Sequence, residues 1–141
     1  MLKTYVAVKA LIKKENTFLI LKNKDSTQSD DLCGWETPGG RLEENEEILD
    51  GLKRETKEET DLTIKILFPF NVYSGDTSAE NAIIGINYLA EYVSGNVVID
   101  SNEHSKFKWC TTEEIRKLTR SFGLQKEIDA YERFRKCVIE L

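Results

Sequence analysis

The chain has 141 residues, of which 40% are hydrophobic and 32% charged, and its formal net charge is −5. This length and composition predict one domain, residues 1–141, with no apolar run long enough to span a membrane. A negative charge without a basic tail argues against general nucleic-acid binding. Three widely spaced cysteines and a start without a signal-peptide pattern favour a reducing cytoplasm.

The first third of the chain predicts a hairpin and a long polar loop. Residues 5–12 and 17–22 are rich in β-forming side chains and flank a polar turn at 13–16, so they predict two paired strands. The polar stretch 23–32 predicts a mobile loop, which is either a functional lid or merely a disordered crossing. Residues 33–40 predict a short strand that ends in a glycine turn.

A strongly acidic segment follows Pro38 and two glycines. Nine carboxylates lie between Glu43 and Asp61 against three cations, so this stretch is more negative than the whole chain. It is filled with good helix formers, and residues three or four apart are neighbours on a helix. The spacing therefore predicts a helix with an acidic face and an adjacent face that docks on the core. The acidic face carries Glu55, Glu58 and Glu59, and the docking face carries Leu49, Leu52 and Thr56.

Gly51 lies inside this helical pattern, where glycine costs roughly 1 kcal/mol relative to Ala. A close approach of another group to the helix backbone would explain its presence. Like charges on one helical face also cost stability, and a divalent cation would reverse that effect because Mg2+ and Mn2+ prefer carboxylate oxygens. The alternative is a solvated acidic helix that binds no ion.

The remainder of the chain predicts further strands and two closing helices. A strand at 63–67 is expected to break at Pro69, with another strand at 70–73 and a loop at 75–80. Residues 82–92 predict a central strand, and shorter strands are expected at 97–99 and 107–110. Thr111 and Thr112 can cap a helix, and apolar residues after Gly123 recur at helical spacing to predict an amphipathic helix.

The acidic segment resembles the signature of the Nudix hydrolases. That signature reads G-x5-E-x7-R-E-(apolar)-x-E-E-x-G-(apolar), and six of its seven fixed positions match here, with Asp61 in place of the last glycine. Asp tolerates the left-handed conformation that the glycine normally adopts, so the exchange affects the end of the helix and not its acidic face. The resemblance implies an α+β fold in which a mixed β-sheet is sandwiched between helices.

The same resemblance implies metal-dependent hydrolysis of a diphosphate linkage in a nucleoside diphosphate derivative. It implies Mg2+ as the cofactor, with Mn2+ as an alternative, and Glu55 and Glu59 as direct ligands. Glu58 is implied as a third ligand or as the base for water, and the Gly39 carbonyl as a further ligand. Arg54 is implied to orient the carboxylates through an ion pair that could involve Glu46. An exposed helix arginine with no such role is the alternative.

Other site residues are implied less directly. Glu103 precedes the 107–110 strand, where family members place a general base or an auxiliary ligand, and it could equally be an ordinary loop carboxylate. Candidate phosphate contacts are Lys22, Lys24 and Arg41, although each is also a normal solvated residue. Trp35 and Phe70 could stack on a nucleobase, or they could simply pack in the core.

The substrate is inferred by elimination. Motifs associated with ADP-ribose, dinucleoside polyphosphate and coenzyme A substrates are absent, which favours a nucleoside triphosphate or a modified nucleotide. A non-catalytic nucleotide-binding domain on the same fold is the alternative, as is a plain acidic interaction module if the motif is coincidental. Many Nudix proteins dimerise, so a homodimer is an option, although no pattern in the sequence shows an interface.

Overall fold

The computed structural model describes residues 3–25, 30–75 and 80–140. Parts of the predicted loops 23–32 and 75–80, namely residues 26–29 and 76–79, lie outside the described residues. Within the described parts, no helix combines the length and apolar character needed to cross a membrane.

Seven strands form one mixed sheet. They are β1 (Lys3–Lys14), β2 (Thr17–Asn23), β3 (Trp35–Glu36), β4 (Gly39–Arg41), β5 (Thr63–Gly75), β6 (Asn81–Ser94) and β7 (His104–Cys110). The main path runs β3-β2-β1-β6-β5, while β4 pairs with β1 and β7 pairs with β2. The β1–β6 pair is parallel and the other pairs are antiparallel.

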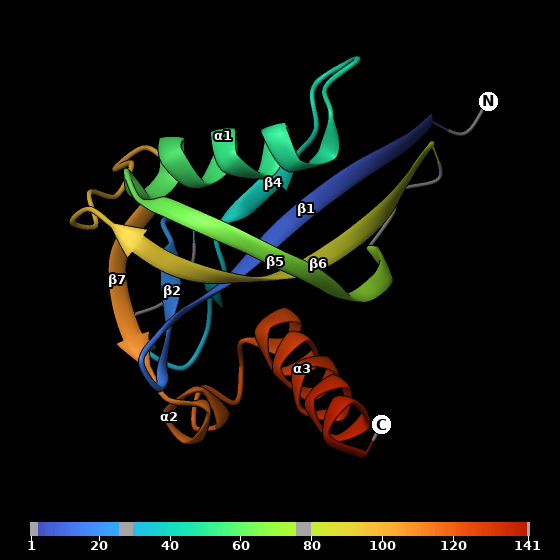
Figure 1. Cartoon of the computed structure of the whole chain (residues 1–141). Helices are drawn as coiled ribbons and strands as arrows, with labels where there is room; N and C mark the ends of the chain where they lie inside the picture. Colours follow the sequence, from blue (N-terminus) through green and yellow to red (C-terminus); the bar gives the residue numbers. More distant parts are fainter. Residues whose placement is uncertain (1–2, 26–29, 76–79, 141) are drawn as a thin grey trace.

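Helices cover both faces of this sheet. Figure 1 shows α1 (Ile48–Thr60) on one side, and α2 (Thr112–Arg116) with α3 (Phe122–Glu140) on the other. Each side has its own cluster of buried residues, which includes Leu52 beneath α1 and Ile128 on α3. The predicted α+β fold, a mixed sheet between helices, is confirmed.

The α1 helix begins later than the acidic segment and ends where the sequence predicted. Glu47 is its N-cap, and its carboxylate accepts hydrogen bonds from the backbone N–H groups of Leu49 and Asp50. Asp61 ends the helix in a left-handed conformation with φ 60°, so Asp does adopt the geometry of the missing glycine. Leu52 and Thr56 are buried as predicted, but Leu49 is 39% exposed, so the prediction for Leu49 is wrong. In the first turn of α1 it is Ile48 that packs against the core.

Two predicted features of the second half are wrong. β5 continues through Pro69, because it is an edge strand whose pairing with β6 is irregular on either side of the proline, and a missing N–H is tolerated there. Residues 97–99 form no strand. They form a loop in which the Val98 N–H donates a hydrogen bond to the Thr60 carbonyl at the end of α1. The side chains of Val97 and Ile99 pack against the core.

Candidate metal centre and adjoining cavity

The carboxylates of α1 lie against the backbone of two glycines. Glu59 accepts a hydrogen bond from the Gly39 N–H at 3.4 Å. A Cβ on Gly40 would lie 2.7 Å from the Glu55 carboxylate, so only glycine allows this approach. Gly39 has φ 150°, and a side chain there would collide with the Val8 carbonyl on β1. The Gly39-Gly40 pair of β4 therefore positions two of the predicted metal ligands.

Arg54 binds several carboxylates around this face. Its guanidinium donates to both oxygens of Glu46, with Nε–Oε2 at 2.6 Å and Nη2–Oε1 at 2.9 Å. A pair of parallel contacts of this kind is stronger and more directional than a single contact. Nη1 also lies 3.1 Å from Glu55 and 3.2 Å from Glu58. The ion pair between Arg54 and Glu46 is thus present. The hydrogen bonds that Arg54 donates lower the pKa of Glu46 to about 2.

Glu59 is buried beside this exposed network. Its exposed fraction is 4%, and burial raises its pKa to about 7. Burial also raises the pKa of Glu55, although Arg54 opposes that shift. Among the described residues, none of the ion pairs includes Glu59. A buried carboxylate without a cation is costly, so this position favours a positively charged ligand.

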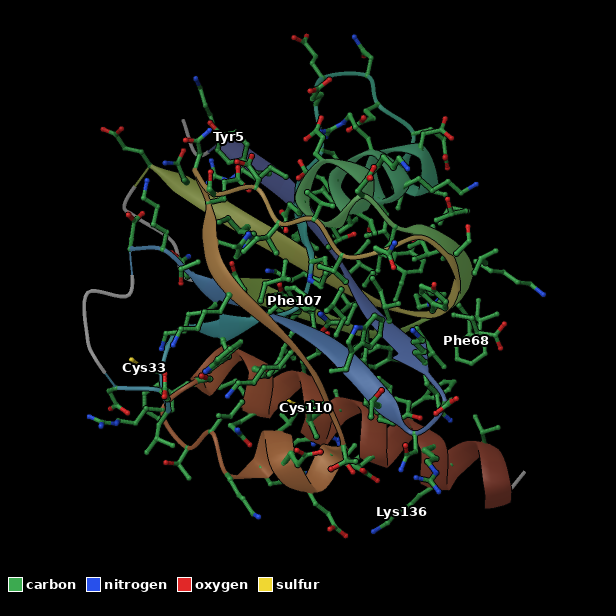
Figure 2. The ribbon with its side chains drawn as sticks, turned by 90° about the vertical axis from the view of Figure 1, so that its left-hand side faces the viewer. Tyr5, Cys33, Phe68, Phe107, Cys110 and Lys136 are labelled. Carbon is green, nitrogen blue, oxygen red and sulfur yellow. The ribbon has the colours of Figure 1, made fainter. Side chains whose placement is uncertain are left out.

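Two residues at the start of β7 face Glu59 from the other wall. One ring nitrogen of His104 and one carboxylate oxygen each of Glu59 and Glu103 lie within 4.8 Å of one another. The turn before β7 is fixed by Asp100, whose carbonyl accepts from the backbone N–H groups of both Glu103 and His104. Figure 2 views the molecule from the β7 side, where Phe107 and Cys110 mark the rest of this strand.

A chain of partly buried polar contacts holds His104. Its Nε2 lies 2.8 Å from Glu36 Oε1, and the other Glu36 oxygen accepts from Lys9 Nζ at 3.3 Å. Lys9 also donates to the Thr37 carbonyl at 3.0 Å. Although burial raises the pKa of Glu36, the bonds to His104 and Lys9 bring it down to about 2. Burial alone would lower the pKa of His104, but Glu36 and Glu59 raise it above its ordinary value.

These donors fit a hard divalent cation. Carboxylate oxygens of Glu55, Glu58, Glu59 and Glu103 are the ligand type that Mg2+ and Mn2+ prefer, and the buried Glu59 needs a counter-charge. The His104 ring adds a nitrogen to the same group. The metal would be held between α1 and the start of β7.

A cavity of about 560 Å³ opens on the α3 side of the sheet. Its polar lining includes Lys9, Glu36, Asn71, Asn87 and Glu127, and its apolar lining includes Trp35 and Leu124. Thr37 Oγ1 donates to the buried Glu127 at 2.8 Å, and the Asn71 amide donates to Asn87 at 2.9 Å. Burial raises the pKa of Glu127 to about 7 despite the opposing charge of Lys9. Lys9 and Glu36 connect this cavity to His104.

The structure gives Lys22 and Trp35 structural contacts. Lys22 is 5% exposed, and its ammonium donates to the carbonyls of Asp30 at 2.8 Å and Cys33 at 2.6 Å. We therefore interpret Lys22 as an anchor for the loop that follows β2, in place of the predicted phosphate contact. Trp35 is buried and donates through Nε1 to the Asp31 carbonyl, but it also lines the cavity.

The other predicted substrate contacts are spread over the molecule. Phe70 packs edge-to-face on Tyr131 at 5.8 Å and is not among the described residues that line the cavity, which favours the packing alternative. Arg41 is exposed, with its guanidinium 4.6 Å from the centre of the Tyr5 ring. Lys24 is also exposed, and its backbone N–H donates to the Glu103 carbonyl. The structure thus brings Lys24 next to the candidate base.

Sequence reasoning missed several buried or partly buried polar residues near the site. Lys9 interrupts an apolar strand, which is a signal that the sequence did offer. Glu127 lies three residues after Leu124 and one before Ile128, so the helical spacing placed it on the buried face of α3. Glu36 and His104 carried no comparable signal, because their contact joins residues 68 positions apart.

A mixed sheet between helices, with a glutamate-rich helix laid on a double glycine, defines the Nudix type of fold. A family model described as the NUDIX domain matches residues 3–131. The chain belongs to the NUDIX domain family.

Three similar proteins support this assignment. An ADP-ribose pyrophosphatase of Methanocaldococcus jannaschii is 32% identical over 65% of this chain and 53% of its own length. An uncharacterized Nudix hydrolase, YvcI of Bacillus subtilis, is 30% identical over 63% of this chain and 58% of its own length. The match therefore spans little more than half the length of these curated relatives. The crystal structure of a MutT protein from Methanosarcina mazei is 27% identical, covers 96% of this chain and 95% of its own, and superposes with a TM-score of 0.77.

Proposed function

We propose that this chain is a metal-dependent hydrolase that cleaves a diphosphate linkage in a nucleoside diphosphate derivative. The observation that carries the proposal is the buried Glu59, whose pKa is raised to about 7 on the same helical face as Glu55 and Glu58. Family membership supports the same conclusion, because the similar proteins described above include a pyrophosphatase and a protein named as a Nudix hydrolase.

In this proposal the protein holds the metal and aligns a water with the phosphorus. Glu55, Glu59 and the Gly39 carbonyl would hold Mg2+ or Mn2+, which would supply positive charge to the diphosphate oxygens and would make bound water more acidic. Glu58 remains more than half exposed and is oriented by Arg54, so it can accept a proton from that water or serve as a further ligand. Glu103 on the opposite wall is the other candidate base or auxiliary ligand. Arg54 aligns the surrounding carboxylates through its ion pairs and opposes the effect of burial on the pKa of Glu55.

The preferred substrate within this class is a nucleoside triphosphate or a modified nucleotide. The cavity beside Trp35 is large enough for a nucleobase and offers amide and carboxyl groups to its edge. Arg41 and Lys24 are exposed and remain candidate phosphate contacts. ADP-ribose is a second candidate, which the name of the M. jannaschii relative favours.

The wider setting is part of the same proposal. We infer a small-molecule partner and no nucleic-acid partner, since the chain is acidic. Three cysteines without disulfides fit a cytoplasmic protein. A homodimer remains an option that would be tested by the oligomeric state in solution.

The decisive experiment is release of a nucleoside monophosphate, the product that all these cleavages share, from a panel of nucleotide substrates. It would include nucleoside triphosphates, ADP-ribose, dinucleoside polyphosphates and nucleotide sugars, each with Mg2+, with Mn2+ and with EDTA. We expect metal-dependent release that falls by about 10²- to 10⁴-fold in Glu58→Gln, the range for loss of a general base. Glu113→Gln, an exposed carboxylate on α2, is the matched control.

Absence of release from every substrate, together with metal-dependent nucleotide binding, would overturn the proposal. The chain would then be a non-catalytic nucleotide-binding domain. An acidic interaction module would show neither release nor a response to metal.

A further inference from the structure

His104 is the single histidine of the chain and is 3% exposed. Its Nε2 is occupied by Glu36 at 2.8 Å. Its Nδ1 is buried and has no hydrogen-bond partner, which is uncommon because buried polar atoms are nearly always satisfied. One nitrogen of the same ring lies within 4.8 Å of a carboxylate oxygen of Glu59 and of Glu103. An unpartnered buried nitrogen on such a ring indicates a missing ligand.

The contact with Glu36 determines which nitrogen is available. A carboxylate accepts hydrogen bonds, so the neutral ring carries its proton on Nε2 and leaves the lone pair on Nδ1. Glu36 is itself held by Lys9, whose ammonium is fixed by the Thr37 carbonyl. Metal-binding histidines almost always donate their other N–H to a carboxylate in this way, because the contact fixes the tautomer and the ring orientation.

The backbone brings two consecutive residues to the same point. Successive side chains in a strand point to opposite faces of the sheet. Glu103 and His104 could therefore not both point toward Glu59 if both lay within β7. Glu103 lies instead in the turn closed by Asp100, immediately before the strand. The pairing of β2 with β7 is also irregular between Lys22 and Asn23, opposite the start of β7, and such irregularities re-aim side chains.

We propose that Nδ1 of His104 is a nitrogen ligand for a divalent cation that it shares with Glu59 and Glu103. The proposal deepens the proposed function, on which it rests through the shared ligand Glu59, by placing a nitrogen donor opposite the all-oxygen face of α1. Imidazole nitrogen suits the transition metals better than Mg2+. The chain therefore prefers Mn2+ to Mg2+ more strongly than a site made of carboxylates alone.

Pulsed electron paramagnetic resonance of the Mn2+-loaded protein tests this directly. The protein would be labelled with 15N only in histidine, so any strong nitrogen coupling to Mn2+ comes from His104. We expect a coupling typical of a directly bound imidazole nitrogen in the wild type and its loss in His104→Gln. Free-Mn2+ measurements should show Mn2+ affinity weaker by at least about tenfold in His104→Gln, with a smaller change for Mg2+.

Two further variants separate ligation from general damage. Glu36→Gln removes the carboxylate behind the ring and should weaken Mn2+ binding while retaining the nitrogen coupling. Lys106→Gln changes an exposed residue on the same strand and should bind Mn2+ as the wild type does. If His104→Gln fails to fold, the coupling in the wild type still decides the matter.

A wild-type protein that binds Mn2+ with no histidine coupling would overturn the proposal, as would an unchanged preference for Mn2+ in a folded His104→Gln. These measurements use no substrate. A protein that hydrolyses nucleotides with Mg2+ but shows no coupling would keep the proposed function and lose this inference. A protein that shows the coupling but hydrolyses no nucleotide would keep this inference and lose the proposed function.

Discussion

Arg54 contacts four carboxylates, yet Glu59 is not among them. Its guanidinium lies within 4 Å of Glu43, Glu46, Glu55 and Glu58. These partners are the more exposed acids, whereas Glu59 is buried on the inner side of the same helix. Arg54 thus pairs with the outer acids of α1, whereas Glu59 takes part in none of the ion pairs among the described residues.

Glu127 provides a test of burial at the scale of one residue. Its pKa is about 7 in the folded chain against an ordinary value of 4.5, so folding favours its protonated form. This stabilisation is present below pH 4.5 and is lost as the pH rises through 7. In EDTA, we expect the free energy of unfolding to fall over this window. Glu127→Gln should remove part of that fall, on the order of 1–3 kcal/mol.

Urea unfolding at a series of pH values from 4.5 to 8 measures this effect. Glu132→Gln, on the next turn of α3, is the matched control and should keep the pH dependence of the wild type. An identical pH profile in Glu127→Gln would show that this carboxyl is ionised in the folded protein. The pKa of Glu59 is raised as well, so Glu59 also makes the free energy of unfolding fall as the pH rises. Glu127→Gln therefore removes only part of that fall.

At the scale of elements, α1 shows how much the sequence alone can predict. The spacing of its glutamates, the burial of Leu52 and the left-handed Asp61 were all predictable, because helix geometry and helix-end conformations depend on residues close in the chain. The exposure of Leu49 was not, since it depends on how far the sheet extends beneath the helix. The continuity of β5 through Pro69 likewise depends on its being an edge strand.

Gly51 illustrates the same dependence on tertiary contacts. The group that approaches its backbone belongs to the protein, because a Cβ there would collide with Leu42 and lie 2.8 Å from Glu46 Oε1. Gly51→Ala should therefore destabilise the fold by about 1 kcal/mol or more, even though alanine favours the helix. Displacement of Glu46 should also disturb Arg54 and lower turnover.

Thermal unfolding and turnover of the purified variant measure both effects. Gly123→Ala is the matched control, because a Cβ at Gly123 meets no atom within 4 Å. That substitution should leave the melting temperature unchanged or raise it slightly. If Gly51→Ala is more stable than the wild type, the side chains of residues 42–46 move away from the added Cβ at little cost in free energy.

For the whole molecule, the parts that escaped sequence analysis are those assembled from distant segments. The candidate metal-binding residues are Glu59 on α1 and Glu103 and His104 at the start of β7. The cavity is lined by residues of β1, β5, β6 and α3. The residue patterns identified α1 as an acidic helix, and the resemblance implied Glu103. Neither could show that Glu36 faces His104 or that Lys9 faces the cavity, because those contacts exist only after strand pairing.

Metal binding should be visible in the stability of the whole fold. A ligand that binds only the folded state stabilises it by about 2.7 kcal/mol at one hundred times its dissociation constant. We expect Mn2+ or Mg2+ to raise the melting temperature by several degrees, and EDTA to reverse the rise. Glu59→Gln should abolish most of it.

The same variant offers an internal check. Replacing a buried carboxylate by a neutral amide should make metal-free Glu59→Gln at least as stable as the wild type above pH 7. Differential scanning calorimetry with and without metal measures both quantities. An equal metal-induced rise in wild type and variant would place the ion elsewhere.

The parallel pairing of β1 with β6 has a consequence for how the chain reaches this structure. It joins Lys3–Lys13 to Asn81–Glu91, so the middle of the sheet closes across most of the sequence. A growing polypeptide can form the β1–β2 hairpin early, but one edge of β1 has no partner until β6 has been synthesised. Long-range pairing of this kind slows folding and leaves an unpaired edge open to other chains. We therefore expect this protein to depend most on chaperones before β6 emerges from the ribosome.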